Sequence, residues 1–287
     1  MQKKQLKELL EFGIINIDKP SGPTSFDVSE FIKKKLALRK TSHFGTLDPK
    51  VTGVLPIALN RACKLTGYFL GEDKKYIGIM RIHEEVDKKK IEELIKNKFL
   101  GRIKQLPPVK SRVKRQIRER EIKSFKILEQ DKEDILFEVE CQGGTYIRKL
   151  IDDLGKELKI GAHMLELRRI KAGIFSENSI VNLYSFEKAV EEYKLGNEKL
   201  LREIIFPAEI IKEIYPFVEI KKESVDKILH GQPIYKKDLI QNYKFENNQT
   251  ICVFSDGGFI GIFKVIEGKE IFAKSEFTMQ PINNKFF

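Results

Sequence analysis

The sequence predicts an α+β fold: a mixed, largely antiparallel sheet with flanking helices, followed by a small C-terminal β-barrel. Strand-like and helix-like apolar patterns are interspersed through the first part of the chain without the regular βαβ period of a parallel doubly wound sheet. Beyond Tyr215 the pattern changes to short apolar runs separated by Gly and Asp turns, which is typical of a small barrel. We therefore expect a main domain over residues 1–210 and a second domain over residues 211–287.

The N-terminal segment is predicted to form a helix, a strand, a turn and a second helix. A short helix at residues 4–11 precedes a strand at Gly13–Ile17, which is expected to stop at the turn cluster Asp18–Pro23. Thr24 and Asp27 resemble a capping box, and apolar residues at helical spacing continue this helix to about residue 36.

The remaining elements follow from the same periodicities. In the best-patterned strand, Ile135, Phe137, Val139 and Cys141 alternate with residues expected to face outward. Strands are predicted at 76–82, 122–128 and 135–141, and helices at 88–97, about 146–158 and about 183–201. In the C-terminal domain, strands are predicted at 217–220, 250–254, 259–266 and 271–274.

The net charge indicates which classes of binding partner are favoured. Of 287 residues, 53 are Lys or Arg and 42 are Asp or Glu, which leaves a formal net charge of +11. Such an excess favours a polyanion, either nucleic acid or an acidic membrane surface, and charge alone does not choose between them. The longest apolar segment, Ile251–Ile266, is interrupted by Ser255–Gly258, so no membrane span is expected.

The cellular compartment and metal content can be predicted from the cysteines, the histidines and the N-terminal residues. Cys63, Cys141 and Cys252 are too widely separated for a disulfide framework or a CxxC pair, which fits a reducing compartment. The histidines lack metal-ligand spacing, so we predict no metal. The first residues lack the apolar core and cleavage signal of a secretory peptide, so we expect the protein inside the cell.

The densest group of chemically informative residues is Thr41–Pro56, which contains Asp48. Pro49 biases Asp48 away from helical backbone and fixes a turn, which would hold the Asp48 carboxylate on a rigid loop. An isolated Asp-Pro pair is more often only a structural turn. Here two glycines and two prolines share one short segment, which favours a functional loop.

Arg148 is a second candidate because of where it stands. A strand is predicted to end at Gly143-Gly144, which places Arg148 in the first turn of the next helix. The helix dipole disfavours a cation there, so a nearby carboxylate, another anion or solvent is expected to compensate it. An ordinary solvated arginine is the alternative interpretation.

A third candidate is the basic run at residues 110–120. It contains six bases and one acid directly after Pro107-Pro108, which indicates a loop that contacts phosphates. A solvated charged face is the alternative, although one-sided charge at this density is less usual there. The bases are Lys110, Arg112, Lys114, Arg115, Arg118 and Arg120.

Five motifs follow one another along the chain, and together they carry a family resemblance. They are Gly13–Ser25, Gly45–Pro56, Pro107–Arg115, Gly144–Arg148 and Leu167–Arg169. In this order they are similar to the motifs of the TruB/dyskerin family of RNA pseudouridine synthases, specifically its archaeal H/ACA guide-dependent branch. The Pro-Lys-Val-Thr-Gly wording at 49–53 resembles that branch more than the bacterial tRNA enzymes. Residues 217–274 resemble a PUA domain, so the resemblance covers nearly the whole chain.

The resemblance implies roles for individual residues. Asp48 matches the family's catalytic aspartate, and Arg148 the arginine paired with it. Tyr76 matches the tyrosine that packs on the target base, Leu167 a pocket residue, and His43 the histidine beside the flipped nucleotide. The basic run matches a thumb-like loop that holds substrate RNA, through Lys110, Arg112, Lys114, Arg115 and Arg118. Taken alone, Tyr76 and Leu167 would be interpreted as ordinary core residues.

The reaction implied needs no cofactor. Uracil leaves C1′ of its ribose, rotates and rejoins through C5 without redox change. Asp48 would act either as a nucleophile or as a base that takes the C2′ proton; both uses require an ionised carboxylate, whose charge Arg148 would stabilise. Tyr76 and Leu167 would offer aromatic and apolar surface to the extruded base.

The resemblance implies the catalytic subunit of an H/ACA ribonucleoprotein that modifies rRNA, with tRNA as a further candidate substrate. Its partners would be the guide RNA, the substrate RNA, and small zinc-ribbon, Gly/Arg-type and kink-turn-binding proteins, with neither DNA nor a membrane. The alternatives are a stand-alone tRNA pseudouridine synthase and a non-catalytic RNA-binding scaffold. We expect the protein in the cytoplasm of an archaeon, or in the nucleolus if the source is a reduced eukaryote.

The chain departs from the family pattern at two places. Ser42 and Phe44 flank His43 where the family usually has small residues, which would alter the local RNA contact. Arg112 stands where alanine is usual. Neither departure involves Asp48, Tyr76 or Arg148.

Overall fold

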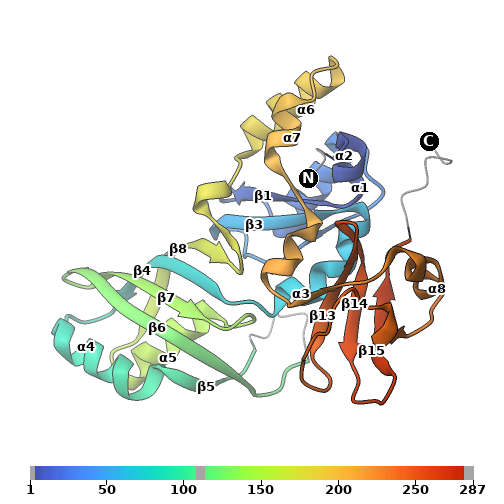
Figure 1. Cartoon of the computed structure of the whole chain (residues 1–287). Helices are drawn as coiled ribbons and strands as arrows, with labels where there is room; N and C mark the ends of the chain where they lie inside the picture. Colours follow the sequence, from blue (N-terminus) through green and yellow to red (C-terminus); the bar gives the residue numbers. More distant parts are fainter. Residues whose placement is uncertain (1–3, 108–113, 281–287) are drawn as a thin grey trace. The chain divides into compact units, whose positions relative to one another are not determined.

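The computed structural model of the chain describes residues 4–107 and 114–280 (Figure 1). The chain divides into two compact units. The larger is Phe12–Phe206, and the smaller consists of the described parts of Met1–Glu11 and Pro207–Phe287. The N-terminal helix α1 (Leu6–Glu11) therefore belongs by its contacts with the C-terminal part of the chain.

The larger unit is built on a ten-stranded sheet with the order β10-β1-β3-β8-β4-β7-β6-β5, to which β2 and β9 add at β3 and β8. The pairing of β3 with β8 is parallel, whereas β1–β3, β4–β8, β4–β7, β6–β7 and β5–β6 are antiparallel. This confirms the predicted α+β class with a mixed, largely antiparallel sheet. The strands are β1 (Gly13–Lys19), β2 (Thr41–His43), β3 (Thr52–Leu59), β4 (Lys74–Ile82), β5 (Gly101–Gln105), β6 (Arg118–Asp131), β7 (Asp134–Cys141), β8 (Ala162–Ala172), β9 (Phe175–Ser176) and β10 (Ile205–Pro207).

Helices of the larger unit connect and flank these strands. Thr24 caps α2, and its side chain and that of Asp27 form the predicted capping box. The helices are α2 (Ser25–Lys35), α3 (Thr66–Leu70), α4 (Lys88–Leu94), α5 (Ile147–Glu157), α6 (Leu183–Lys194) and α7 (Lys199–Ile204). Helix α4 continues into a π-helical turn at Ile95–Phe99, and 3-10 helices lie at Asn60–Leu65 and Glu177–Ser179.

Several predicted boundaries were wrong. Strand β1 does not stop at Ile17 but runs through Asp18 and Lys19, because both residues pair with β3. The single helix expected at 183–201 is two helices, since the chain turns at Gly196, whose φ of +94° suits glycine. Strands β3, β5 and β8 were not predicted at all.

The core of the larger unit lies on the sheet. In β7, Ile135, Phe137, Val139 and Cys141 are buried and alternate with half-buried residues, as predicted. Phe44, which departs from the family pattern, is a core residue: its ring stacks on that of Phe69 with centroids 4.4 Å apart.

The smaller unit contains a five-stranded, curled sheet with the order β11-β13-β14-β15-β12. Its strands are β11 (Phe217–Glu219), β12 (Ile234–Tyr235), β13 (Thr250–Ser255), β14 (Gly258–Val265) and β15 (Ile271–Thr278), with the short helix α8 (Val225–Leu229). The strand predictions for this part are confirmed, except that β12 and α8 were missed. An apolar cluster that includes Val218, Ile251 and Phe263 forms the core of this unit.

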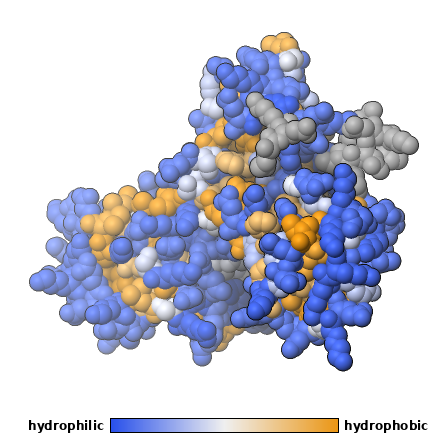
Figure 2. All heavy atoms as spheres, in the orientation of Figure 1, coloured by the Kyte–Doolittle hydropathy of each residue, from blue (hydrophilic) through white to orange (hydrophobic). Residues whose placement is uncertain are grey.

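Hydrophilic residues cover most of the face drawn in Figure 2, with smaller hydrophobic patches between them. Within residues 4–107 and 114–280, no helix has the length and apolar composition needed to cross a bilayer.

Candidate active site

Asp48 lies in the loop between β2 and β3, where Val51 N donates to its carbonyl oxygen at 3.0 Å and closes the predicted turn. An Arg148 Nη2 atom lies 2.8 Å from Asp48 Oδ2. The Arg148 and Asp48 side chains are 59% and 46% exposed, so a substrate can reach both groups. Of the carboxylate, other anion or solvent expected to compensate Arg148 in the first turn of α5, the structure shows a carboxylate, that of Asp48.

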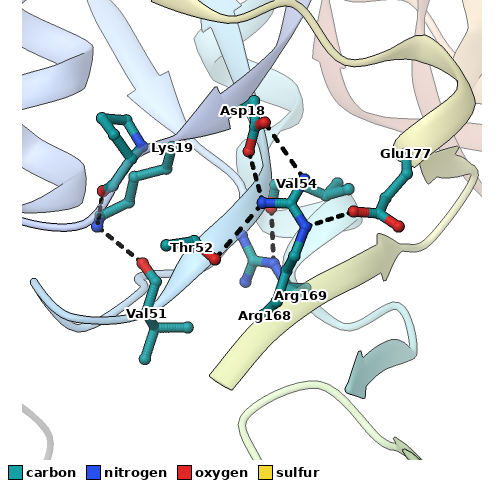
Figure 3. Close-up of polar contacts among 9 residues, drawn as sticks. Asp18, Lys19, Val51, Thr52, Val54, Arg168, Arg169 and Glu177 are labelled. Atoms are coloured by element: carbon teal, nitrogen blue, oxygen red, sulfur yellow. Dashed lines mark hydrogen bonds and ion pairs between the residues drawn. The ribbon is translucent and has the colours of Figure 1, made fainter. Parts of the chain in front are cut away.

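The buried Lys19 side chain fixes the segment that follows Asp48 (Figure 3). Its Nζ atom donates to the carbonyl oxygens of Pro20, Pro49 and Val51 at 2.8–2.9 Å. Burial lowers the pKa of Lys19, and the negative charge of Asp48 opposes that shift. Three acceptors match the three donors of an ammonium group, so backbone carbonyl groups satisfy every hydrogen bond of the buried Lys19 Nζ.

Ser25 fixes the segment that precedes Asp48. Its hydroxyl accepts a hydrogen bond from Leu47 N at 2.8 Å and donates to the carbonyl oxygen of Leu47 at 3.1 Å. Ser25 is fully buried at the start of α2. Since hydrogen bonds are directional, Ser25 and Lys19 together restrain the backbone on both sides of Asp48.

Arg169 joins the wider loop to the sheet. It is 1% exposed; Nε donates to the carbonyl oxygen of Val54 at 2.8 Å and Nη2 to that of Gly45 at 3.0 Å. Its guanidinium also interacts electrostatically with the Tyr76 hydroxyl group. Burial lowers the pKa of Arg169, and its interactions with Tyr76 oppose the shift. Arg169 thus contacts the backbone before and after Asp48, at Gly45 and Val54, and also interacts with Tyr76, the predicted base-stacking residue.

Tyr76 and Leu167 lie on the same face of neighbouring strands. In the β4–β8 register, Tyr76 is opposite Arg169 and Gly78 is opposite Leu167, so all four face one way. Tyr76 and Leu167 are 8% and 7% exposed. Burial raises the pKa of the Tyr76 phenol, with the positive charge of Arg169 opposing, so the ring is neutral. The two predicted pocket residues are therefore adjacent and linked to Asp48 through Arg169.

Arg168 points to a different set of partners. Its Nη1 and Nη2 atoms bind the Asp18 carboxylate at 2.9 and 3.2 Å, and Nε donates to Glu177 at 2.5 Å (Figure 3). These bonds tie β8 to the end of β1. Arg168 is a structural neighbour of the site, and its charge is already matched by two carboxylates.

His43 is the last residue of β2 and is half-buried. Among the described residues, its buried Nδ1 atom has no hydrogen-bond partner. Burial lowers the pKa of His43, and the positive charge of Arg169 lowers it further, so the ring is neutral at pH 7.

The basic run is described only in part. Lys110 and Arg112 lie outside the described residues, while Lys114 and Arg115 are exposed in irregular structure. Arg118 is half-buried at the start of β6, as is Arg120 two residues later. A Cβ atom at Gly144, in the turn before α5, would lie 3.1 Å from Arg120 Nη2. The structure therefore brings the end of this run beside the turn that leads to Arg148.

The side chains that hold the loop were not predicted from the sequence. Lys19, Ser25 and Arg169 lie inside the motifs named above, but nothing in the sequence pattern marks them as buried. Burial of a cation is unusual, and only the three-dimensional arrangement of carbonyl groups reveals its partners. No three His, Cys, Asp or Glu side chains within the described ranges are grouped as metal ligands.

Comparison with known proteins places this geometry in a family. Residues 33–147 match the TruB family pseudouridylate synthase N-terminal domain, residues 148–211 the tRNA pseudouridylate synthase B C-terminal domain, and residues 2–29 the DKCLD (NUC011) domain. A protein of Methanopyrus kandleri named probable tRNA pseudouridine synthase B is 46% identical over 256 residues, which cover 88% of this chain and 75% of that protein. The chain belongs to the TruB family of pseudouridine synthases.

Other relatives agree with this assignment. A probable tRNA pseudouridine synthase B of Methanocaldococcus jannaschii is 43% identical across 88% of this TruB-family chain and 75% of its own length. Among solved structures, a Cbf5-Nop10-Gar1 complex contains a similar chain with a TM-score of 0.89 and 35% identity, covering 98% of this chain and 88% of that one. An H/ACA RNP bound to a substrate RNA containing 2′-deoxyuridine contains another, with a TM-score of 0.88 and 33% identity, covering 98% and 89%. The protein is thus a pseudouridine synthase with the fold of these chains.

Proposed function

We propose that Asp48 is the catalytic carboxylate of this pseudouridine synthase and that Arg148, Tyr76, Leu167 and His43 form its uridine pocket. The observation that supports this most is the 2.8 Å pair between Asp48 and Arg148. Both groups are accessible, yet the backbone on either side of Asp48 is restrained by the buried Lys19 and Ser25. A catalytic carboxylate must be accessible to its substrate and held in a fixed position, and this loop meets both requirements.

The arrangement suits the chemistry. Extruding the target uridine from its stack costs a few kcal/mol, which contacts with the Tyr76 ring and Leu167 would offset. In the isomerisation, the bond from N1 to C1′ breaks, a bond from C5 to C1′ forms, and the C5 proton is lost while N1 gains one. Asp48 acts on this path either as a nucleophile or as the base for the C2′ proton, and the Arg148 guanidinium stabilises its negative charge in both.

We further propose that the protein works as the catalytic subunit of an H/ACA guide RNA complex. The support is its likeness, at 33–35% identity and TM-scores of 0.88–0.89, to chains of such complexes. Guide and substrate RNA, and small zinc-ribbon, Gly/Arg-type and kink-turn-binding proteins, would be its partners. Residues 211–287 would be a PUA-like RNA-binding domain, and Lys110, Arg112, Lys114, Arg115 and Arg118 would contact RNA. No DNA, membrane or cofactor enters this proposal. We place the protein in the cytoplasm of an archaeon, because the relatives named above are proteins of Methanopyrus kandleri and Methanocaldococcus jannaschii.

A second candidate is a stand-alone tRNA pseudouridine synthase. The names of the relatives at 43–46% identity favour it. The same pocket would serve, so the two candidates differ in how the uridine is chosen.

One assay separates these candidates. Pseudouridine is measured by base-specific chemical labelling in two reactions, one with unmodified tRNA alone and one with guide RNA, paired target and the accessory proteins. Turnover only in the second reaction is expected for a guide-dependent enzyme, whereas efficient turnover of tRNA alone favours the second candidate.

Asp48→Asn serves as the control in both reactions. We expect it to abolish pseudouridine formation while RNA affinity, measured by filter binding, stays within about threefold, because the substitution removes a charge but little volume. Measurable pseudouridine from this variant would overturn the assignment of Asp48. RNA binding without turnover by the wild-type protein would favour a non-catalytic scaffold.

A further inference from the structure

The Gln105 side chain both donates and accepts a hydrogen bond, and the mechanism described above gives this residue no role. It is the last residue of β5 and is 2% exposed. Its Nε2 atom donates to the carbonyl oxygen of Tyr146 at 3.1 Å, and Tyr146 N donates to Gln105 Oε1 at 3.0 Å. The side-chain amide therefore pairs with the backbone of one residue as a neighbouring strand would.

Tyr146 is where α5 begins. It is the N-cap residue of α5, and its side chain makes no capping hydrogen bond there. The turn before it contains Gly144 at a φ of +85°, a conformation that by itself allows several paths into the helix. Arg148 follows two residues later, in the first turn of α5. The Gln105 contact is thus made at the residue that sets where α5 starts.

Beyond its first turn, α5 is held mainly by apolar packing, together with one exposed ion pair between Lys98 and Glu157, the last residue of the helix. Ile147, Leu150, Ile151 and Leu154 are buried along one face of the helix. Apolar packing fixes which face is covered but restrains sliding along the axis only weakly, because it is not directional. One residue of slip moves a helix by about 1.5 Å, which is enough to break a 2.8 Å ion pair such as Arg148 with Asp48.

We infer that Gln105 is a positioning residue for catalysis: its amide fixes the first turn of α5 so that the Arg148 guanidinium meets the Asp48 carboxylate. The inference rests on the proposed roles of Asp48 and Arg148. It predicts that Gln105 acts on the chemical step and that it acts through Arg148.

Gln105→Met tests this, because methionine fills a similar volume without either hydrogen bond. We expect the single-turnover rate at saturating RNA to fall about 10–100-fold while the RNA dissociation constant changes less than threefold. Gln130→Met is the matched control: Gln130 Nε2 donates to the carbonyl oxygens of Val86 and Lys132 in another part of the same unit. The control should keep the wild-type rate. Equal losses in both variants, or a Gln105→Met loss confined to RNA binding, would overturn the inference.

A double-mutant cycle with Arg148→Lys shows whether Gln105 acts through Arg148. Lysine keeps the charge but not the fixed guanidinium geometry, so adding Gln105→Met to it should cost less than threefold further. Losses that multiply would point to independent effects and contradict the inference.

An NMR readout covers the case in which the double variant has no measurable rate. The Arg148 Nε–Hε signal, assigned by its loss in Arg148→Lys, should change in Gln105→Met as it does in Asp48→Asn. An unchanged signal would overturn the inference. If Asp48→Asn retains turnover, the proposed function fails; if it is inactive while Gln105→Met reacts like the wild type, only the role of Gln105 fails.

Discussion

Three buried cations surround the Asp48 loop, and all of them bind backbone carbonyl groups. Lys19 and Arg169 hold the loop itself, and Lys74 donates to the carbonyl oxygens of Phe69, Leu70 and Glu72. A Cβ atom at Gly45 would lie within 4 Å of both Arg169 and Lys74. Carbonyl dipoles satisfy the hydrogen bonds of a cation without cancelling its charge. The positive potential beneath the loop therefore remains available to an anionic substrate.

The pH dependence of stability should report on Lys74. Its burial, with the charge of Arg169 adding, lowers the pKa of Lys74 to about 8, while Glu72 opposes the shift. Between about pH 8 and 10.5 the Lys74 amine is protonated in the unfolded chain but not in the folded chain. The contribution of Lys74 to the free energy of unfolding therefore increases with pH in this range. Below pH 8 both states hold the proton and this contribution is constant. Lys74→Met removes it.

We expect the difference in unfolding free energy between wild type and Lys74→Met to shift by about 1–2 kcal/mol in favour of the wild type from pH 7 to 9.5. Urea denaturation followed by circular dichroism measures it. Because other titrating groups are common to both proteins, the comparison isolates Lys74. A difference that does not change with pH would contradict this account.

The exposed residues of the candidate site could be predicted from the sequence, but the buried residues that restrain them could not. The family resemblance paired Asp48 with Arg148, the dipole argument independently called for a compensating group near Arg148, and the two side chains lie 2.8 Å apart. Lys19 and Arg169 could not be recognised, because their partners are main-chain carbonyl oxygens that have no sequence signature. Residue type identifies the reacting groups, whereas only the fold identifies what restrains them.

At the scale of elements, the site depends on a close approach between β3 and β8. These strands pair in parallel at only two positions, one of which is Gly53 opposite Arg169. Gly53 has a φ of +99°, and a Cβ atom there would lie 2.2 Å from the carbonyl oxygen of Arg169. The glycine thus allows the strand that carries Arg169 to approach the loop that carries Asp48.

Gly53→Ala should therefore destabilise the larger unit by about 2–4 kcal/mol, from left-handed strain and backbone overlap together. It should also lower turnover, because Arg169 must shift. Gly67→Ala is the matched control: Gly67 lies in α3 with open space around its Cβ position and should be neutral or slightly stabilising. Denaturation curves of the three proteins decide the matter, and equal midpoints for the two variants would contradict the argument.

Strands in which apolar and polar residues alternate could be predicted from the sequence. Strands whose two faces are not clearly divided into a buried and an exposed one could not. Strand β7 shows plain alternation because one face is covered and the other is not. Strand β8 carries Arg168, Arg169 and Glu166 among its apolar residues, since it pairs with β4 on one side and with the start of β3 on the other. Strand β3 is buried almost throughout, so it shows no alternation either. Two strands at the site, β3 and β8, were therefore missed, whereas β4, which carries Tyr76, was predicted.

At the scale of the whole molecule, the net charge of +11 favours binding to RNA, and the salt dependence of that binding identifies which cations contact phosphates. Net charge raises affinity for any polyanion, but only cations that touch phosphates release counterions stoichiometrically. Arg118 and Arg120 are candidates, because they stand two residues apart on one face of β6 and, within the described residues, their buried Nε atoms have no partner. Arg120 also lies next to Gly144, in the turn before Arg148.

We expect Arg118→Gln and Arg120→Gln each to reduce the slope of log K against log salt concentration by about 1. Lys89→Gln removes the same charge from an exposed position on α4 and should leave the slope unchanged. Filter binding of the RNA that the turnover assay selects, at several salt concentrations, gives the three slopes. Equal slopes would mean that RNA responds to overall charge. A difference confined to the two arginines would instead locate the phosphate path along β6 toward Arg148, and the same residues that bind RNA would then lead its uridine to Asp48.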